Sequence, residues 1–141
     1  PIGGHHFVKE IIEKKEISYT EAQDLLYKEG VSSVLKSDSV DDPSSLSVTE
    51  RSVFDNLIED IRRSLRFYAK QTGQSFFLKI LLSGGSADTP GLTKLISSKL
   101  NIDSDILNPF DGVEGADSLS VENPSQYVLA MGLCIRAGMD K

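Results

Sequence analysis

The sequence has few of the residues that stabilise secreted domains, bind nucleic acid or cross membranes. It has one cysteine and no tryptophan, so no disulfide can form within the chain and a reducing cytoplasm is the expected compartment. The formal net charge of -6 excludes the dense positive surface that nucleic-acid binding needs. No apolar run approaches the ~18 residues of a membrane span. With 39% hydrophobic and 26% charged residues, the composition is that of a soluble globular protein.

Patterns that bind metal ions are also missing from the sequence. His5 and His6 stand side by side, without further Cys or His residues at ligand spacing. Asp38, Asp41 and Asp42 lack the central Gly and terminal Glu of a calcium loop. We therefore predict no metal site and no catalytic residue in this chain.

Helical periodicity dominates the first part of the chain. Apolar residues recur at helical spacing over residues 5–15, which predicts a first helix. Ser18-Tyr19-Thr20-Glu21 has the form of a capping box, because the serine can accept a backbone hydrogen bond while the glutamate reaches back. A second helix is therefore expected to run to about Lys28 and to end at Gly30.

The next region combines a polar stretch with the longest amphipathic segment. Residues 31–46 are rich in Ser and Asp and are predicted to form a loop. Residues 47–50 form a second capping-box pattern. Apolar residues from Phe54 to Tyr68 then follow one helical stripe, and Gly73 is expected to end this long helix.

Two short strands with a helix between them are predicted next. Residues 75–82 are nearly all apolar, which is typical of a strand covered on both faces. Thr89 and Pro90 suit the N-cap and first position of a helix that continues to about Leu100. A weaker strand is expected over residues 102–107.

The sequence ends in a Gly/Asp/Ser-rich loop and a final helix. The loop covers residues 111–122, and Asn123-Pro124 marks the start of a helix that ends at Gly138. The single cysteine, Cys134, falls in the apolar pattern of this helix, and we expect it to be buried and inert.

The predicted order of elements is that of a helix-rich α/β protein. Two strands are too few to make a good sheet alone, so we expect partner strands elsewhere. The chain opens at Pro1 without an initiator Met or a targeting peptide, and we expect it to be part of a longer protein.

The segment KILLSGGSADTPGL, residues 79–92, carries the strongest functional signal. A strand brings the chain to the carboxyl edge of a sheet, where ligand clefts of α/β folds form. Gly84 and Gly85 lack a Cβ and let a flat ring or a ribose approach the backbone. The N–H groups at the start of the following helix can receive an anion. These features predict one end of a nucleotide site, and a plain tight turn is the alternative.

Five stretches resemble one superfamily of ATPases. ILLSGGSADTPGL at 80–92 resembles the adenosine motif of the actin-like ATPases, and PIGGHHFVKEI at 1–11 is similar to the stretch after their second phosphate motif. EDIRRSLRFYAKQ at 59–71, ILNPFDGV at 106–113 and YVLAMGLCIRAG at 127–138 resemble the PilM family, the cytoplasmic actin-like proteins of type IV pilus assembly. The resemblance covers essentially the whole chain, in the order of the family.

The resemblance implies an α/β fold that is part of an actin-like, ribonuclease H-like ATPase domain. Residues 1–73 would be a helix-rich outer subdomain and residues 74–141 a segment of the core sheet subdomain. ATP with Mg²⁺ is expected between two lobes of a cytoplasmic protein, which reaches the inner membrane through partners such as the cytoplasmic tail of a PilN-like protein. The motifs that hold Mg²⁺ and the phosphates are expected before Pro1, so we expect no ATP hydrolysis by this chain alone.

The resemblance also implies which residues contact the nucleotide. Gly84, Gly85 and Ser86 are expected beside the adenosine. Gly3 and Gly4 are expected either beside the phosphates or in a plain turn that leads into the first helix.

The second predicted helix departs from the pattern of the superfamily. Relatives carry a Glu-x-x-Lys pair that holds the adenosine, and Gln23 and Leu26 occupy those positions here. Gln23 can hydrogen-bond a ribose hydroxyl, and Leu26 can lie against an adenine face without donating or carrying charge.

Two other functions share parts of this pattern. The second lobe of a sugar or acid kinase also contains the adenosine motif, and a FtsA-like filament protein would add an amphipathic C-terminal helix. Arg62, Arg63 and Arg66 can either meet an acidic partner or form an ordinary solvated helix face.

Overall fold

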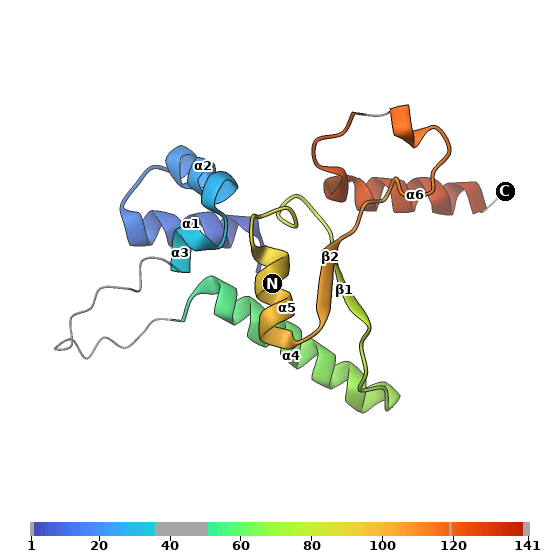
Figure 1. Cartoon of the computed structure of the whole chain (residues 1–141), viewed down its shortest axis with the longest axis horizontal. Helices are drawn as coiled ribbons and strands as arrows, with labels where there is room; N and C mark the ends of the chain where they lie inside the picture. The colour runs from blue at the N-terminus through green and yellow to red at the C-terminus, as the bar shows by residue number, and fades with distance from the viewer. Residues whose placement is uncertain (1, 36–50, 119, 140–141) are drawn as a thin grey trace.

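The computed structural model describes residues 2–35, 51–118 and 120–139. It is a mixed α/β structure, mostly helical, with one two-stranded parallel sheet. Three helices lie together on one side of the strands, and the last helix lies on the opposite side (Figure 1). The predicted α/β class is therefore confirmed.

The first helices begin and end as the sequence predicts. Helix α1 covers Gly4–Lys15 and α2 covers Tyr19–Glu29. The capping box is formed, because the Ser18 N–H donates to the Glu21 carboxylate over 2.9 Å and the Glu21 N–H donates to the Ser18 hydroxyl over 3.4 Å. Gly30 ends α2 with a φ of 59°, which favours glycine.

The segment after Gly30, predicted to be mostly loop, begins with a short helix that the sequence pattern did not predict. Residues 32–35 form the short helix α3, Ser32–Leu35. Its Val34 side chain is fully buried, and the Ser33 hydroxyl donates to the Gly30 carbonyl over 2.6 Å. Tertiary packing and this local bond override the polar composition. The rest of the predicted loop, with the three aspartates and the second capping-box pattern, lies outside the described residues.

Helix α4, Val53–Thr72, is the longest element, and it crosses beneath the other helices (Figure 1). Its N-cap is Ser52, whose hydroxyl accepts from the Phe54 N–H over 3.2 Å. Gly73 ends it with a φ of 72°, as predicted.

One hydrophobic core joins α1–α4 to α5, Leu92–Leu100. The rings of Phe7 and Phe54 stack at its centre with a centroid distance of 4.5 Å. The buried members are Phe7, Val8, Ile11, Ala22, Leu26, Val31, Val34, Phe54, Ile58, Leu92 and Ile96. Because this cluster contains residues from both sides of residue 73, the predicted division into subdomains stays a prediction.

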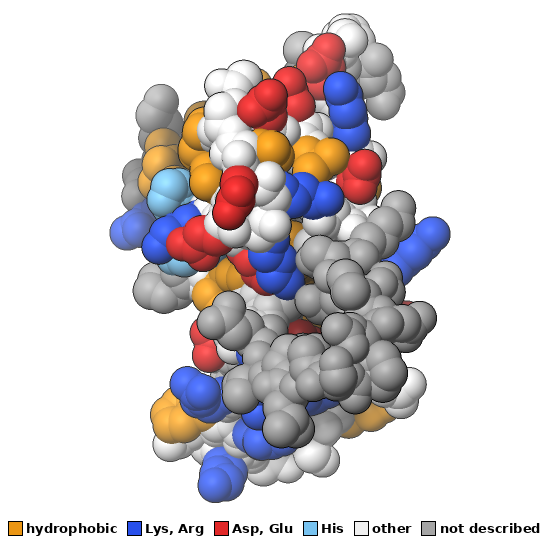
Figure 2. All heavy atoms as spheres, turned by 90° about the vertical axis from the view of Figure 1, so that its left-hand side faces the viewer, with side chains coloured by type: hydrophobic (Ala, Val, Ile, Leu, Met, Phe, Trp, Pro, Cys, Tyr) orange, Lys and Arg blue, Asp and Glu red, His pale blue; other side chains and the backbone are white. Residues whose placement is uncertain are grey.

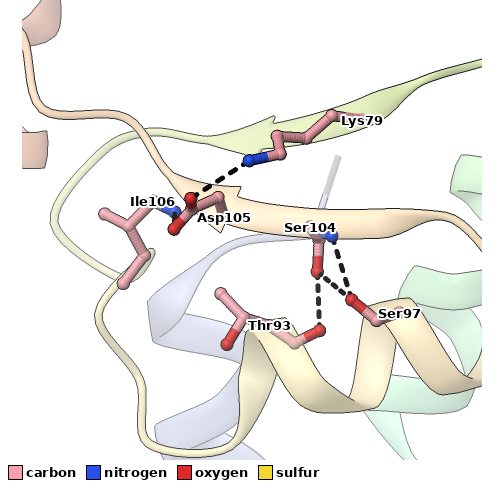
Figure 3. A network of polar contacts seen from close by, with 6 residues as sticks. All are labelled: Lys79, Thr93, Ser97, Ser104, Asp105 and Ile106. Carbon is pink, nitrogen blue, oxygen red and sulfur yellow. Dashed lines mark hydrogen bonds and ion pairs between the residues drawn. The ribbon is translucent and has the colours of Figure 1, made fainter.

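Helix α5 connects two parallel strands, β1 (Lys79–Leu82) and β2 (Asp103–Ile106), in a βαβ unit. Polar contacts hold β2 to the helix and to β1 (Figure 3). The Ser104 N–H donates to the Ser97 hydroxyl over 2.9 Å, and the Ser104 hydroxyl donates to the Thr93 carbonyl over 2.6 Å. The Lys79 ammonium lies 3.3 Å from the Asp105 carboxylate.

Two details of this unit differ from the sequence predictions. Strand β1 is shorter than predicted and its side chains alternate between exposed and half-buried, because among the described residues only β2 pairs with it. Helix α5 begins at Leu92 with Gly91, at a φ of 82°, as its N-cap. Thr89 and Pro90 belong to the preceding turn, where the Thr89 hydroxyl donates to Ser86 and the Pro90 carbonyl accepts from Val31.

The C-terminal elements are two 3₁₀ turns, η2 (Ala116–Ser118) and η3 (Pro124–Tyr127), followed by α6, Val128–Met139. Helix α6 has no buried residue. The expectation that Cys134 is buried is therefore wrong, because no described element covers its side of the helix. Within the described ranges, no helix is long and apolar enough to cross a membrane.

Candidate functional site at the glycine turn

The seven residues implied by the resemblance line two adjoining cavities. The larger cavity, about 460 Å³, lies between the start of α1, α4, the end of β1 and α5. The smaller, about 240 Å³, lies between α1, α2 and the turn after β1. Gly4, Gly85 and Ser86 line both cavities, so these residues form a shared wall. Segments from the start, the second helix and the middle of the sequence thus meet at one place.

The larger cavity contains Gly3, Gly4, Gly84, Gly85 and Ser86, five of the seven. Its other walls are mostly apolar side chains of the core elements. They are Ile2, Phe7, Leu57, Ile61, Leu81, Leu82, Ser83, Ala87, Leu92 and Ile96.

The glycine turn keeps its backbone open. Gly84 has a φ of 99°, which an L side chain rarely adopts, whereas Gly85 has no such constraint. A Cβ built on either residue meets no atom within 4 Å. The missing side chains therefore leave open space, and a ligand can approach this backbone.

Position 4 lacks room for a side chain, because α1 contacts the glycine turn there. A Cβ on Gly4 would collide with the hydroxyl of Ser86. Gly3 is the extended N-cap of α1, with a φ of -150°, and its N–H donates to Nδ1 of His6 over 3.2 Å. The first turn of α1 therefore starts directly against the shared wall.

Ser125 forms hydrogen bonds with the glycine turn. It is fully buried, and its carbonyl accepts from the Gly84 N–H over 3.0 Å. Its hydroxyl lies 3.0 Å from the Gly84 carbonyl, 2.9 Å from the Asp88 carboxylate and 3.0 Å from the Asn123 amide oxygen. Since the 3₁₀ turn η3 carries Ser125, the C-terminal region fixes the shape of the site.

The smaller cavity contains Gln23 and Leu26. Leu26 is only 5% exposed and belongs to the core cluster, so most of its side chain packs inside the protein. Gln23 is half-buried, and its amide donates to the Tyr27 hydroxyl over 3.4 Å. Aromatic rings of His5, Tyr19 and Tyr27 line the same cavity.

Among the described residues that line these two cavities, none is Lys, Arg, Asp or Glu. On the face that Figure 2 shows, acidic and basic side chains are mixed. Arg62 pairs with Glu59 and Arg63 with Asp60, so ion pairs within α4 account for part of its basic face. A neutral cavity is suited to a ring or a sugar rather than to a free charge.

Two carboxyl groups with lowered pKa values, Glu21 and Asp105, lie outside the cavities. The Ser18 hydroxyl and N–H donate to the Glu21 carboxylate and lower the pKa of Glu21. The Ile106 N–H, followed by the Lys79 ammonium, lowers the pKa of Asp105. Neither shift belongs to a group that faces a ligand.

Sequence reasoning did not identify several residues of the site. Asn123-Pro124 marks a helix start, but nothing in the sequence links Ser125 to a turn 41 residues away. Tyr19 and Tyr27 are typical of an amphipathic helix surface, and Tyr27 stands one turn after Gln23. That spacing is the one signal in the sequence that points to Tyr27.

Comparison with known proteins identifies the family of the chain. No individual curated protein matches the chain. The model of a family described as type IV pilus assembly protein PilM matches residues 1–138, nearly the whole chain. The chain therefore belongs to the PilM family of type IV pilus assembly proteins.

Proposed function

We propose that the two cavities form the adenosine side of an ATP site in a PilM-type protein. The observation that carries the proposal is the meeting of three distant segments around one neutral, glycine-walled space. The segments are the start of α1, the outer face of α2 and the turn after β1. Ordinary packing of a turn against two helices would not require open backbone at both Gly84 and Gly85.

Each part of the site has a chemical role in this proposal. The open backbone at Gly84 and Gly85 lets the nucleoside lie against the turn. The Gln23 amide can donate to or accept from a ribose hydroxyl. The N–H groups at the start of α1, beside Gly3 and Gly4, favour the negative charge of a phosphate.

These residues bind ATP with Mg²⁺ but do not cleave it. Phosphoryl transfer relies on carboxylates that hold Mg²⁺ and on a group that orients the attacking water. The cavity linings include no carboxylate among the described residues. We expect no Mg²⁺-dependent phosphate release from the 141-residue chain, and measurable release would contradict this assignment.

Calorimetric titration with ATP tests the site, using the natural protein that carries these residues. Gly85→Leu places a side chain in the cavity without a conformational penalty, because Gly85 does not need a positive φ. We expect at least a tenfold loss of ATP affinity, about 1.4 kcal/mol. Gly132→Leu is the control, since Gly132 lies on α6 with equally open space at its Cβ. Absence of ATP binding to the unsubstituted protein, or full affinity in Gly85→Leu, would overturn the proposal.

The second part of the proposal concerns pilus assembly. Family membership supports a role in type IV pilus assembly. We propose that the protein acts on the cytoplasmic side of the inner membrane, through protein partners. We propose that ATP sets the arrangement that receives the cytoplasmic tail of a PilN-like protein. A PilN tail peptide is expected to bind with different affinity in the presence and absence of ATP. Equal affinity in both conditions would show that ATP does not control the binding of the PilN tail.

A further inference from the structure

We propose that Tyr27 is the platform on which the nucleobase stacks. The inference rests on the proposed nucleotide site and assigns an aromatic wall to the nucleobase, opposite the open backbone of the glycine turn. It also accounts for a large aromatic side chain that the protein keeps 61% exposed on the rim of the smaller cavity.

The ring of Tyr27 is free to accept a flat partner. Its hydroxyl accepts from the Gln23 amide over 3.4 Å, which links the rim of the cavity to the predicted ribose contact one helical turn away. Among the described residues, no aromatic ring stacks on Tyr27. Tyr19, on the same cavity, has the His5 ring at 6.4 Å. Tyr27 is therefore the better platform of the two tyrosines.

The opposite wall of the smaller cavity is the glycine turn. Gly85 and Ser86 line this cavity together with Tyr27, and the missing side chain of Gly85 leaves open space there. A planar ring can therefore lie between a tyrosine face on α2 and bare backbone on the turn. No Lys, Arg, Asp or Glu lines this cavity within the described part of the chain, which suits a neutral heteroaromatic ring.

Stacking makes a specific prediction about selectivity. Every base has a π-face, so an aromatic platform strengthens binding without reading the hydrogen-bonding edge of the base. Tyr27 should therefore increase the affinity for ATP and GTP by similar factors. It should not affect a ligand that has phosphates but no base.

Titration of the natural protein with ATP, GTP and inorganic tripolyphosphate tests the assignment. Tyr27→Ala should weaken both nucleotides by a factor of about 5 to 100, the range of one base–aromatic stack. Tripolyphosphate binding should not change. Tyr27→Phe keeps the ring and should bind nucleotides within about twofold of the original protein, because the platform is the ring and not the hydroxyl.

Two further variants separate stacking from a structural effect. Phe67→Ala removes an aromatic side chain of similar exposure, 65%, from α4 outside both cavities, and should leave ATP affinity unchanged. Tyr27→Trp places an indole on the rim of the cavity, and ATP should quench the fluorescence that this variant adds to that of the unsubstituted protein.

The outcomes distinguish this inference from the proposed function. If the unsubstituted protein binds neither ATP nor GTP, the nucleotide site is wrong and the platform is overturned with it. If ATP binds but Tyr27→Ala keeps full affinity, the platform alone is overturned. The same holds if tripolyphosphate binding falls in parallel, or if the Tyr27→Trp fluorescence does not respond.

Discussion

Helix α1 and helix α6 are both 12 residues long, yet α1 packs into the core whereas α6 lies exposed. Helix α1 buries Phe7, Val8 and Ile11 in the common core. Helix α6 is the more apolar helix but buries no residue, and its Leu129 and Met139 side chains are 75% and 81% exposed. Apolar composition alone therefore does not determine burial, which depends on what the rest of the fold brings alongside.

The candidate site lies where these two kinds of region meet. The packed helices supply the walls, while Ser125 of the C-terminal region hydrogen-bonds to Gly84 in the turn. The following predictions test this contrast, from the largest expected effect to the smallest.

The largest effect is expected in the core. Phe54→Ala removes a ring that is 1% exposed and stacked on Phe7, and should lower the free energy of unfolding by about 3–5 kcal/mol. Leu133→Ala, at a side chain 59% exposed on α6, should change it by less than about 0.5 kcal/mol. Urea unfolding followed by circular dichroism compares the two. Similar losses would show that α6 packs as tightly as the core.

Glycine substitutions should have opposite signs in the two regions. Gly30→Ala forces a Cβ into a φ of 59° and against the Pro90 carbonyl, so we expect a loss of about 2–3 kcal/mol. Gly132→Ala, inside α6 with open space around it, should raise stability by about 0.5–1 kcal/mol through helix propensity. Both changes are measured by the same unfolding experiment. A loss of stability in Gly132→Ala would place another group against this face of α6.

Removal of the Ser125 hydroxyl should loosen the glycine turn. Ser125→Ala removes the bonds that this buried hydroxyl makes to Asp88 and Asn123, and should cost about 0.5–1.5 kcal/mol. Ser98→Ala, at an exposed serine of α5, should cost less than about 0.5 kcal/mol. Hydrogen exchange at the Gly84 amide should accelerate in the first variant only. Unchanged exchange there would show that the Ser125 hydroxyl does not hold the glycine turn.

The smallest effect concerns pH and the start of α2. The pKa of Glu21 is lowered in the folded protein by the Ser18 donors, so the unfolded chain holds this proton more tightly. The stabilisation by Glu21 is therefore present above its unfolded pKa and is lost as pH falls through the folded pKa. Ser18→Ala should raise the pKa of Glu21, as followed by NMR of the side-chain carboxyl. An unchanged pKa would contradict the capping-box assignment.

Local signals predicted the parts of the fold that depend on local bonds. The capping box at Ser18 and the glycine ends at Gly30 and Gly73 involve partners within a few residues, so the sequence contains all that determines them. The exposure of Cys134 depends instead on which elements lie alongside, and the prediction for it was wrong. The N-cap prediction for Thr89 was also wrong, because its hydroxyl bonds Ser86 in the turn and the next residue, Pro90, accepts from the distant Val31.

The same distinction applies to the candidate site. The glycine turn was visible as a motif, and the family resemblance pointed to Gln23 and Leu26. Tyr27 joined the proposed site only because the fold brings α2 next to the turn. The contact between Ser125 and Gly84 spans 41 residues, and no spacing rule in a single sequence predicts it.

Backbone amide NMR during an ATP titration tests the central claim most directly, because it reports on each segment of the site at once. We predict that the amides of Gly4, Gln23 and Gly85 shift together with one dissociation constant, while that of Leu133 on α6 stays in place. Shifts confined to α6, or none at the first three residues, would contradict the account.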